Sequence, residues 1–342
     1  MHRVAVIVNA HAHAFVARPA LVDAVVSLAE GRATVAVTHD ARELRLAAER
    51  ARDDAADVVV LCGGDGSYSA GATAIHAAFS GRSAPILALA PGGTVGTVPR
   101  SLGVAAKGST LDGIAHVLHR ACGEGRAVIE QPTLSVVADG GARRLSFIFG
   151  TGLVASFFEI YDPRGAERQR RGELEAPSGG AGLLGAALIV GRIFVESFYG
   201  GAYARRVLTP MACEVRVDRG GGDELLPWRA SSLVVASVVG DLGLGMRVTH
   251  RAAEDPQRPH VVVSGLSPRA LGPRMPRVLA ARRIGDDGEP HFDDLVERLT
   301  VRFPDAPGPY VLEGDLRIAR EVIVTAGPTI RLLRLAPTGD CQ

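Results

Sequence analysis

Short apolar runs alternate with longer amphipathic stretches over the first third of the chain. The runs are rich in β-branched residues and are bounded by turn-forming residues, so they predict buried strands at Val4–Val8, Ala33–Thr38, Val58–Cys62 and Pro85–Ala90. The stretches between them repeat apolar residues at helical spacing, and we expect helices over Arg18–Glu30, Ala41–Arg52, Ser67–Ser80 and Thr110–Ala121. Strands that alternate with helices predict a parallel sheet built by right-handed crossovers.

The pattern changes after about Arg126. Short alternating runs separated by Gly, Pro and Asp predict strands at Arg126–Ala138, Arg143–Phe149, Ala212–Asp218, Ser232–Val239, His260–Ser264 and Arg277–Arg283. Only Val154–Tyr161 and Leu183–Phe198 have a helical pattern there, and the polar segment Arg164–Gly180 is expected to be a mobile loop. The sequence therefore predicts an α/β domain over residues 1–125 and an antiparallel β-sandwich domain over residues 126–342.

The run Val58–Cys62 stops abruptly at Gly63-Gly64-Asp65-Gly66-Ser67, and an alanine-rich helical pattern follows. Glycines without a Cβ let backbone N–H groups approach a phosphate, and the dipole of the following helix favours negative charge. A carboxylate in such a turn would repel a phosphate unless a cation joins it. Asp65 therefore points to a nucleotide-phosphate site with a divalent metal, of which magnesium is the simplest choice.

A second glycine turn follows the next predicted strand. Pro85–Ala90 runs into Pro91-Gly92-Gly93-Thr94, so two parallel strands would end in glycine-rich loops at the same edge of a sheet. Ligands of open α/β sheets bind at that carboxyl edge. The alternative is that glycine turns simply connect strands to helices. One loop would not decide between the two interpretations, but two loops, one with an aspartate, favour a ligand site.

Composition removes several other classes of function. The chain has 342 residues with 47% hydrophobic and 22% charged residues and a net charge of +1, which fits two globular domains and gives no reason to expect a nucleic-acid partner. Lys107 is the single lysine and does not follow a glycine turn at P-loop spacing. The four cysteines form no C-x-x-C pair, and the start resembles a strand rather than a signal peptide, so we expect a cytoplasmic protein.

The most apolar stretch begins at Ala181 and is interrupted by Arg192 and Glu196. It falls short of the roughly 20 apolar residues that a membrane span needs. A buried or half-buried helix is therefore expected. The alternative is a surface helix that touches lipid, in peripheral contact with the inner face of a membrane.

The chain resembles the diacylglycerol kinase and sphingosine kinase family of lipid kinases in three features. These are the turn Gly63-Gly64-Asp65-Gly66-Ser67, the Pro91-Gly92-Gly93-Thr94 loop ending in Pro99-Arg100-Ser101-Leu102-Gly103, and the order of an α/β domain followed by a β domain. The resemblance covers most of the chain. It implies an N-terminal domain of the NAD kinase/diacylglycerol kinase type, ATP in the cleft between the domains, and a short acidic motif near the C-terminus that returns to that cleft.

The resemblance assigns roles to individual residues. It implies that Asp65 acts near the γ-phosphate or its Mg²⁺, that Glu313 is the general base for a lipid hydroxyl, and that Asp315 is a metal ligand or supports one; residues 310–316 would return to the cleft. The expected nucleotide-binding residues are Asn9, Gly63, Gly64, Gly66, Ser67, Gly92, Gly93 and Thr94.

Several motif positions depart from the family. The acidic motif of the family reads Asp-Gly-Glu, whereas this chain has Glu313-Gly314-Asp315. The second loop of the family reads Gly-Thr-x-Asn-Asp, whereas Gly96-Thr97 follows Val95 here. Each lost hydrogen bond to a charged phosphate costs on the order of 1.5–3 kcal/mol.

Alternatives stay open at this point. Gly-Gly-Asp-Gly also resembles phosphofructokinases and NAD kinases, which phosphorylate non-lipid acceptors, although the second half of the chain does not fit the sugar kinases. A degenerate relative that binds a lipid or nucleotide without catalysis is the other alternative. The sequence does not decide whether the lipid acceptor is diacylglycerol-like, sphingoid-like or a prenyl or polyketide-type alcohol. It also does not decide whether the protein forms a homodimer.

Overall fold

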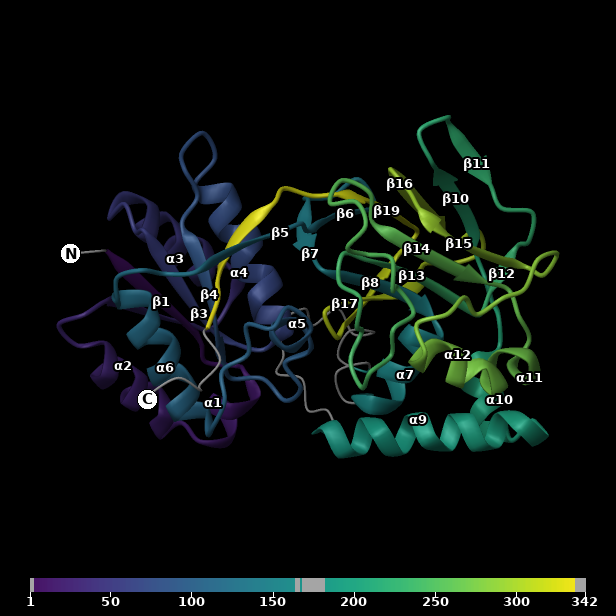
Figure 1. Ribbon diagram of the computed structural model, residues 1–342, viewed down its shortest axis with the longest axis horizontal. Helices are drawn as coiled ribbons and strands as arrows, with labels where there is room; N and C mark the ends of the chain where they lie inside the picture. The colour runs from purple at the N-terminus through teal and green to yellow at the C-terminus, as the bar shows by residue number, and fades with distance from the viewer. Residues whose placement is uncertain (1–2, 164–166, 168–181, 336–342) are drawn as a thin grey trace. The chain divides into compact units, whose positions relative to one another are not determined.

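The computed structural model describes residues 3–163, 167 and 182–335 (Figure 1). The chain forms two compact units, an N-terminal domain of residues 1–131 and 329–342 and a C-terminal domain of residues 132–328. The predicted loop Arg164–Gly180 lies, apart from Glu167, outside the described residues.

The N-terminal domain is built on one six-stranded sheet with the order β2-β1-β3-β4-β20-β5. Strands β2, β1, β3, β4 and β20 run parallel, and β5 pairs antiparallel with β20. The strands span Val4–Asn9 (β1), Thr34–Thr38 (β2), Val58–Gly63 (β3), Ile86–Pro91 (β4), Val128–Gln131 (β5) and Ile330–Leu333 (β20). The parallel α/β architecture that the sequence predicted is confirmed.

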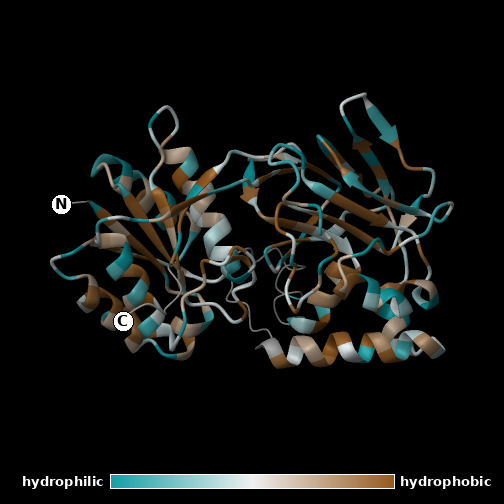
Figure 2. Cartoon of the chain, viewed as in Figure 1, coloured by the Kyte–Doolittle hydropathy of each residue, from teal (hydrophilic) through white to brown (hydrophobic). Residues whose placement is uncertain are grey.

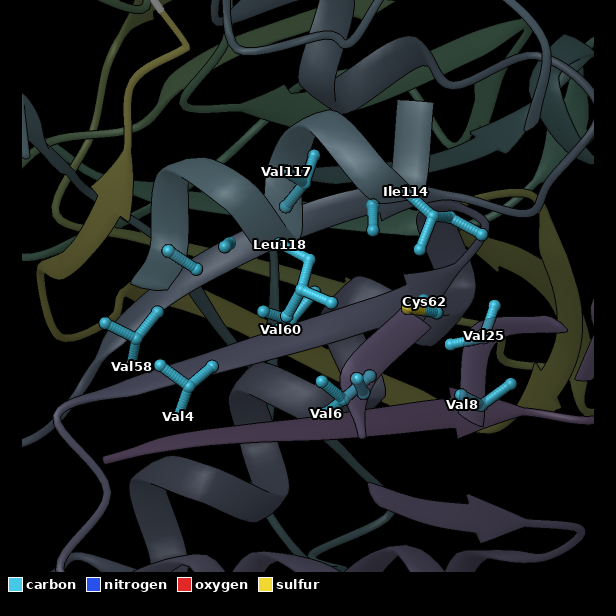
Figure 3. Close-up of a cluster of buried hydrophobic side chains, with 14 of the residues drawn as sticks. Val4, Val6, Val8, Val25, Val58, Val60, Cys62, Ile114, Val117 and Leu118 are labelled. Carbon is cyan, nitrogen blue, oxygen red and sulfur yellow. The ribbon is translucent and has the colours of Figure 1, made fainter. Parts of the chain in front are cut away.

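Helices cover this sheet because each one has an apolar face. The helices span His13–Ala17 (α1), Ala20–Ala29 (α2), Ala41–Asp53 (α3), Asp65–Ala78 (α4), Thr97–Ser101 (α5) and Thr110–Cys122 (α6). Helices α2 and α6 pack on one face of the sheet, where valines of β1 and β3 meet Val25, Ile114 and Leu118 (Figure 3). Continuous valine runs suit strands that are buried on both faces.

The boundary between the domains differs from the expected one near residue 125. The chain leaves the N-terminal domain after Gln131 and returns to it at Thr329, because β20 extends the first sheet between β4 and β5. Pro132 divides the predicted strand Arg126–Ala138 into β5 and β6, since proline cannot donate to a ladder. At the return, Thr133 accepts from the N–H of Gly327 and its Oγ1 donates to the carbonyl of Pro328 at 2.7 Å.

The C-terminal domain contains two six-stranded antiparallel sheets, ordered β11-β10-β16-β19-β6-β7 and β15-β14-β13-β8-β17-β18, and a short β12-β9 pair. Apolar residues recur along the strands of both sheets (Figure 2). Alternate residues of β10 and β16 are apolar and buried, whereas β13 and β14 are buried along their whole length. The expectation of an antiparallel domain is confirmed. The strands span Leu134–Ala138 (β6), Arg144–Ser146 (β7), Ile148–Gly152 (β8), Met211–Ala212 (β9), Glu214–Asp218 (β10), Asp223–Leu225 (β11), Ala230–Ser231 (β12), Leu233–Ser237 (β13), His260–Ser264 (β14), His291–Leu295 (β15), Arg298–Arg302 (β16), Gly308–Leu312 (β17), Asp315–Ala319 (β18) and Glu321–Ala326 (β19).

A layer of helices packs on one face of the second sheet, around Leu233, Val235 and Val262. It includes the two expected helices and adds others: Leu153–Tyr161 (α7), Gly182–Tyr199 (α9), Ala202–Leu208 (α10), Pro268–Leu271 (α11), the 3₁₀ turn Gly272–Arg274 (η1) and Met275–Leu279 (α12). The predicted strand Arg277–Arg283 is wrong. Pro276 lies in the first turn of α12, a position that favours a helix start.

Within the described residues, no single helix is long and apolar enough to span a membrane. Leu184–Tyr199 and Ala202–Leu208 are the one pair of described helices that is together long and apolar enough for a span. The chain bends by 104° at the break between these two helices.

Candidate functional site

The candidate site lies at the carboxyl edge of the N-terminal sheet. Strands β1, β3 and β4 are parallel neighbours, and their registers bring Val8 opposite Cys62 and Gly63 opposite Pro91. The glycine-rich loops after β3 and β4 therefore start side by side, as the sequence predicted. This is the edge at which open α/β sheets bind ligands.

The two loops touch through their backbones. A Cβ built at Gly93 would lie 2.5 Å from the Cα of Gly64, and one at Gly92 would lie 2.9 Å from the Cα of Gly63. A Cβ at Gly63 would lie 2.4 Å from the Oγ of Ser67. These distances are too short for any side chain, so the packing of one loop on the other already requires the glycines.

Asn9 and Ser67 connect β1 to the first loop. The Asn9 Nδ2 donates to the Oγ of Ser67 at 2.8 Å, and the N–H of Gly64 donates to the same Oγ at 3.3 Å. The Asn9 Oδ1 accepts from the N–H of His11 at 2.9 Å. With two donors on its oxygen, the Ser67 hydroxyl keeps its own hydrogen for an acceptor outside this network.

Tyr68 contacts the backbone at the start of both glycine loops, a role that the Gly63–Ser67 motif did not predict. Its side chain is buried, and its hydroxyl lies 2.9 Å from the carbonyl of Gly63 and 2.9 Å from that of Ala90. Burial raises the pKa of Tyr68 well above its ordinary value, so the hydroxyl stays a donor. The signal was present in the sequence, because the residue three positions after Asp65 faces the same side of α4.

Asp65 binds the second loop. Its Oδ2 accepts from the N–H of Thr97 at 2.8 Å and its Oδ1 accepts from the N–H of Val98 at 3.0 Å. These are the first residues of α5, so Asp65 caps that helix from another element. Burial raises the pKa of Asp65, and the two N–H groups oppose this only in part. The sequence had predicted a role beside the phosphate or its metal, and that role stays a prediction.

Thr97 stands near the place where the family has an Asn-Asp pair. The family motif has asparagine and aspartate side chains there. In this chain the backbone N–H of Thr97 binds Asp65. Gly96 before it adopts a φ of 63°, a left-handed conformation that suits glycine, and this turns the chain into α5. Thr94, which was predicted to bind nucleotide, lies between the glycine pair Gly92-Gly93 and the turn at Gly96, and its side chain is half-buried.

The N-terminus of α4 is the part of this edge that is suited to an anion. Gly64 precedes the helix in an extended conformation, and Asp65, Gly66 and Ser67 form its first turn. Their N–H groups have no carbonyl acceptor within the helix, and the helix dipole adds a partial positive charge there. The 14-residue length of α4 gives it a full dipole. This arrangement can hold a phosphate oxygen.

Glu313 belongs to the C-terminal domain, in the two-residue turn between β17 and β18. Its φ of 50° is left-handed, as is that of Gly314 at 89°. Its Oε1 accepts from the N–H of Phe147 at 2.5 Å, from the N–H of Ile148 at 2.9 Å and from the hydroxyl of Ser146 at 2.8 Å. Three donors on one oxygen favour the carboxylate form and fix the side chain in place. The sequence did not reveal these partners.

Asp315 follows in β18. Its Oδ2 lies 3.5 Å from the Arg317 guanidinium, and half of its side chain is exposed. Among the described residues no group of three or more His, Cys, Asp or Glu side chains is placed to hold a metal ion. A magnesium ion held entirely by protein side chains does not fit the described part of the chain. One that arrives with nucleotide phosphates needs only one or two carboxylates.

The fold and the site define the class of protein: an α/β domain with a helix N-terminus at the edge of a parallel sheet, joined to an antiparallel domain. The family described as the diacylglycerol kinase catalytic domain matches residues 3–126. Residues 3–126 are therefore similar to that family, and the resemblance seen in the glycine motifs is confirmed for them.

Solved structures extend the likeness to the whole fold. A protein from Bacillus anthracis str. Sterne, provisionally described as a diacylglycerol kinase, matches with a TM-score of 0.57 and 15% identity, covering 98% of this chain and 97% of its own. A second structure with that description matches with a TM-score of 0.59 and 13% identity, covering 97% of each chain. A third, described as a diacylglycerol kinase from the same organism, has a TM-score of 0.54 and 12% identity over 98% of this chain and 97% of its own. No curated protein sequence matches the chain.

Proposed function

We propose that the protein transfers the γ-phosphate of ATP, with Mg²⁺, to the hydroxyl of a lipid of the diacylglycerol or sphingoid type. The observation that carries this proposal is the N-terminus of α4. This helix begins within the first glycine loop and beside the second, in a domain that matches the diacylglycerol kinase catalytic domain. Helix N-termini of this kind bind phosphates.

The proposed nucleotide contacts come from the N-terminal domain. The N–H groups of Gly66 and Ser67 would bind phosphate oxygens, and the Ser67 hydroxyl, with its oxygen already bound by Asn9, would donate to one of them. Gly92, Gly93 and Thr94 would line the second loop. Asp65 would act mainly by fixing α5 against this loop, because both of its oxygens already accept N–H groups there.

The proposed acidic residues come from the C-terminal domain. Asp315 would be the carboxylate that meets a nucleotide-bound Mg²⁺, because half of its side chain is exposed. Glu313 would accept the proton of the lipid hydroxyl. Its three donors weaken it as a base, but phosphoryl transfer depends more on positioning and charge than on proton abstraction.

The test is transfer of labelled γ-phosphate from Mg-ATP into a total lipid extract. Asp315→Asn is the informative variant, because it removes the charge and keeps the size of a side chain that is half exposed. Asp305→Asn, in an exposed loop of the same domain, is the matched control. We expect labelled lipid with the unmodified protein and the control, and at least a tenfold loss with Asp315→Asn. Equal label with all three proteins would remove Asp315 from the reaction.

A second candidate function has a specific observation in its favour. The carboxylates of Asp65 and Glu313 both bind backbone N–H groups of their own domain, as purely structural carboxylates do. A relative that binds ATP or lipid without transfer would show saturable ATP binding in equilibrium dialysis and no label in any lipid. That combination would replace the kinase proposal by the binding function.

A further inference from the structure

The exposed face of α9 is almost entirely apolar. Five of the twelve exposed large hydrophobic residues in the described part of the chain lie on this one helix. Their spacing of four, seven, three and one places all of them within about 100° of the helix circumference. These residues, called here the α9 stripe, are Leu184, Leu188, Val195, Phe198 and Tyr199, exposed by 75%, 66%, 58%, 60% and 64%.

The residues between them on the same face do not break the stripe. Ala187 and Gly191 are exposed and small, and a Cβ at Gly191 would meet nothing within 4 Å. Arg192 is the one charged residue of the face. Hydrophobic residues accordingly recur along the length of α9 in Figure 2. Isolated exposed leucines are ordinary, but a continuous apolar stripe marks an interaction surface.

The opposite face of α9 holds the helix firmly on the domain. Ala186, Ile193 and Ser197 are buried there. Gly272 of η1 approaches so closely that a Cβ at this position would lie 2.0 Å from the Ser197 side chain. The helix therefore already has its core contacts, and the α9 stripe is not needed for folding.

The corner between α9 and α10 is also fixed. The Glu196 Oε2 accepts from the N–H of Tyr203 at 2.9 Å and of Ala204 at 3.3 Å, which caps the start of α10. Arg192 donates to the Glu196 Oε1 at 2.8 Å, and its guanidinium lies 4.2 Å from the Tyr203 ring centre. The stripe thus lies on a rigid helix pair.

Arginines outnumber acidic residues on α9 and on α10 and α11, the two helices that contact it. Helices α9, α10 and α11 contain four arginines (Arg192, Arg205, Arg206 and Arg269) and one acid, Glu196. Arg205, Arg206 and Arg269 are exposed. The guanidinium of Arg269 lies beside Gly200, at the end of α9, because a Cβ there would be 3.0 Å from its Nε.

We infer that the α9 stripe lies flat on the surface of a bilayer that contains anionic lipids. Apolar side chains would enter the boundary between headgroups and acyl chains, and the arginines would meet lipid phosphates, the two contributions that interfacial helices combine. A second copy of the chain fits less well, because it would bring two positively charged surfaces together. The inference deepens the proposed function, because a lipid acceptor would be met at this surface.

The experiment measures binding to sonicated vesicles by co-sedimentation, without nucleotide. Vesicles of phosphatidylcholine alone are compared with vesicles containing about a third phosphatidylglycerol. Leu188→Asn and Val195→Asn change the stripe; Leu46→Asn and Val26→Asn change exposed residues of the same kinds on helices of the N-terminal domain. We expect each stripe variant to weaken binding about tenfold, as the loss of one buried leucine or valine predicts, and the controls to bind like the unmodified protein.

A charge variant and a spectroscopic variant test the two parts of the inference. Arg205→Gln combined with Arg206→Gln should lower binding to the anionic vesicles by about tenfold or more and leave binding to neutral vesicles unchanged. In Phe198→Trp, the emission of the new tryptophan should shift to the blue when vesicles are added.

Three results would overturn the inference: stripe variants that bind as well as the controls, an unmodified protein that binds neither kind of vesicle, or a dimer that the same stripe variants dissociate in the absence of lipid. Because no nucleotide is present, these results are independent of the kinase proposal. A protein that binds vesicles but transfers no phosphate would keep this inference and remove only the proposed reaction.

Discussion

The two domains hold their acidic residues in different ways. In the N-terminal domain, Asp65 lies in a motif of five consecutive residues, and its partners Thr97 and Val98 are only 32 and 33 positions away. In the C-terminal domain, Glu313 lies in a two-residue turn, and its partners are 165 to 167 positions away in β7, β8 and the residue between them. One site is made by neighbouring strand ends, the other by a long-range strand pairing.

The difference teaches what each motif can reveal. A parallel strand and the loop that follows it are formed by consecutive residues. The glycines, the aspartate and the start of the helix can therefore be recognised in one short segment of sequence. A hairpin acid is positioned by whatever its turn meets in the folded sheet. We therefore expect the N-terminal site to depend on backbone contact between the two glycine loops. The C-terminal site should depend on the hydrogen bonds that hold the Glu313 side chain.

The largest effect is expected for Gly93→Ala. A Cβ at this position would lie 2.5 Å from the Cα of Gly64, and backbone cannot move aside without separating the two loops. We expect a loss of about 2–3 kcal/mol in the free energy of unfolding of the N-terminal domain, measured by urea denaturation.

Gly221→Ala is the control for this change, because a Cβ there would meet nothing within 4 Å. It should leave the unfolding free energy within about 0.5 kcal/mol of that of the unmodified protein. An equally mild effect of Gly93→Ala would show that the loops are not in contact in solution.

A smaller loss is expected for Glu313→Gln. The amide oxygen can still accept a hydrogen bond, but the charge that strengthens the bonds from Ser146, Phe147 and Ile148 is gone. We expect the C-terminal domain to lose about 1–3 kcal/mol of stability, and hydrogen exchange at Phe147 and Ile148 to accelerate. Glu224→Gln, which removes an exposed ion pair with Arg219, should change stability by less than about 1 kcal/mol. An unchanged rate of hydrogen exchange at Phe147 would contradict the hydrogen bond from its N–H to Glu313.

Asp65→Asn should act mainly on α5. An amide replaces one of the two oxygens that accept from Thr97 and Val98, so one N–H at the start of α5 loses its partner. We expect a loss of about 1–2 kcal/mol and faster hydrogen exchange within Thr97–Ser101. Asp53→Asn, an exposed acid at the end of α3, is the matched control. Loss of phosphate transfer without any change in α5 would instead favour a direct role for Asp65 in the reaction.

The smallest effect is a pH dependence of the C-terminal domain. Burial would raise the pKa of Asp293, but the contacts with His260 (2.7 Å) and His291 (3.7 Å) outweigh it and lower the pKa below its ordinary 3.8. An acid with a lowered pKa in the folded state stabilises the fold above its unfolded pKa and loses that contribution as the pH falls through its folded pKa.

The measurement is the urea midpoint of the C-terminal domain between pH 6 and pH 3. The unmodified protein should lose stability progressively below about pH 4, and Asp293→Asn should show a shallower slope there. Asp305→Asn, exposed in a loop, should keep the slope of the unmodified protein. The same slope in all three proteins would mean that Asp293 does not contribute to acid sensitivity.

The secondary structure of the first domain was predictable because its signals are local. Valine runs such as Val58–Cys62 and glycine-terminated helices predicted β1 to β4 and helices α2, α3, α4 and α6. The C-terminal domain was less predictable. Strands β15 to β20 have mixed apolar and polar residues and were not identified, and α12 was taken for a strand because Arg277–Arg283 alternates.

The sequence by itself determined the α/β-then-β order, the two glycine loops, and the edge of the sheet at which they meet, because these depend on strand period, turn residues and helix starts within short segments. Only the tertiary structure decided that β20 joins the first sheet, that Asp65 caps α5, that Tyr68 ties both loops, and that Glu313 is held by β7 and β8. Those contacts, apart from that of Tyr68 with Gly63, join different elements of the fold. Hydrogen-bond partners of that kind are chosen by packing, and local sequence does not encode them.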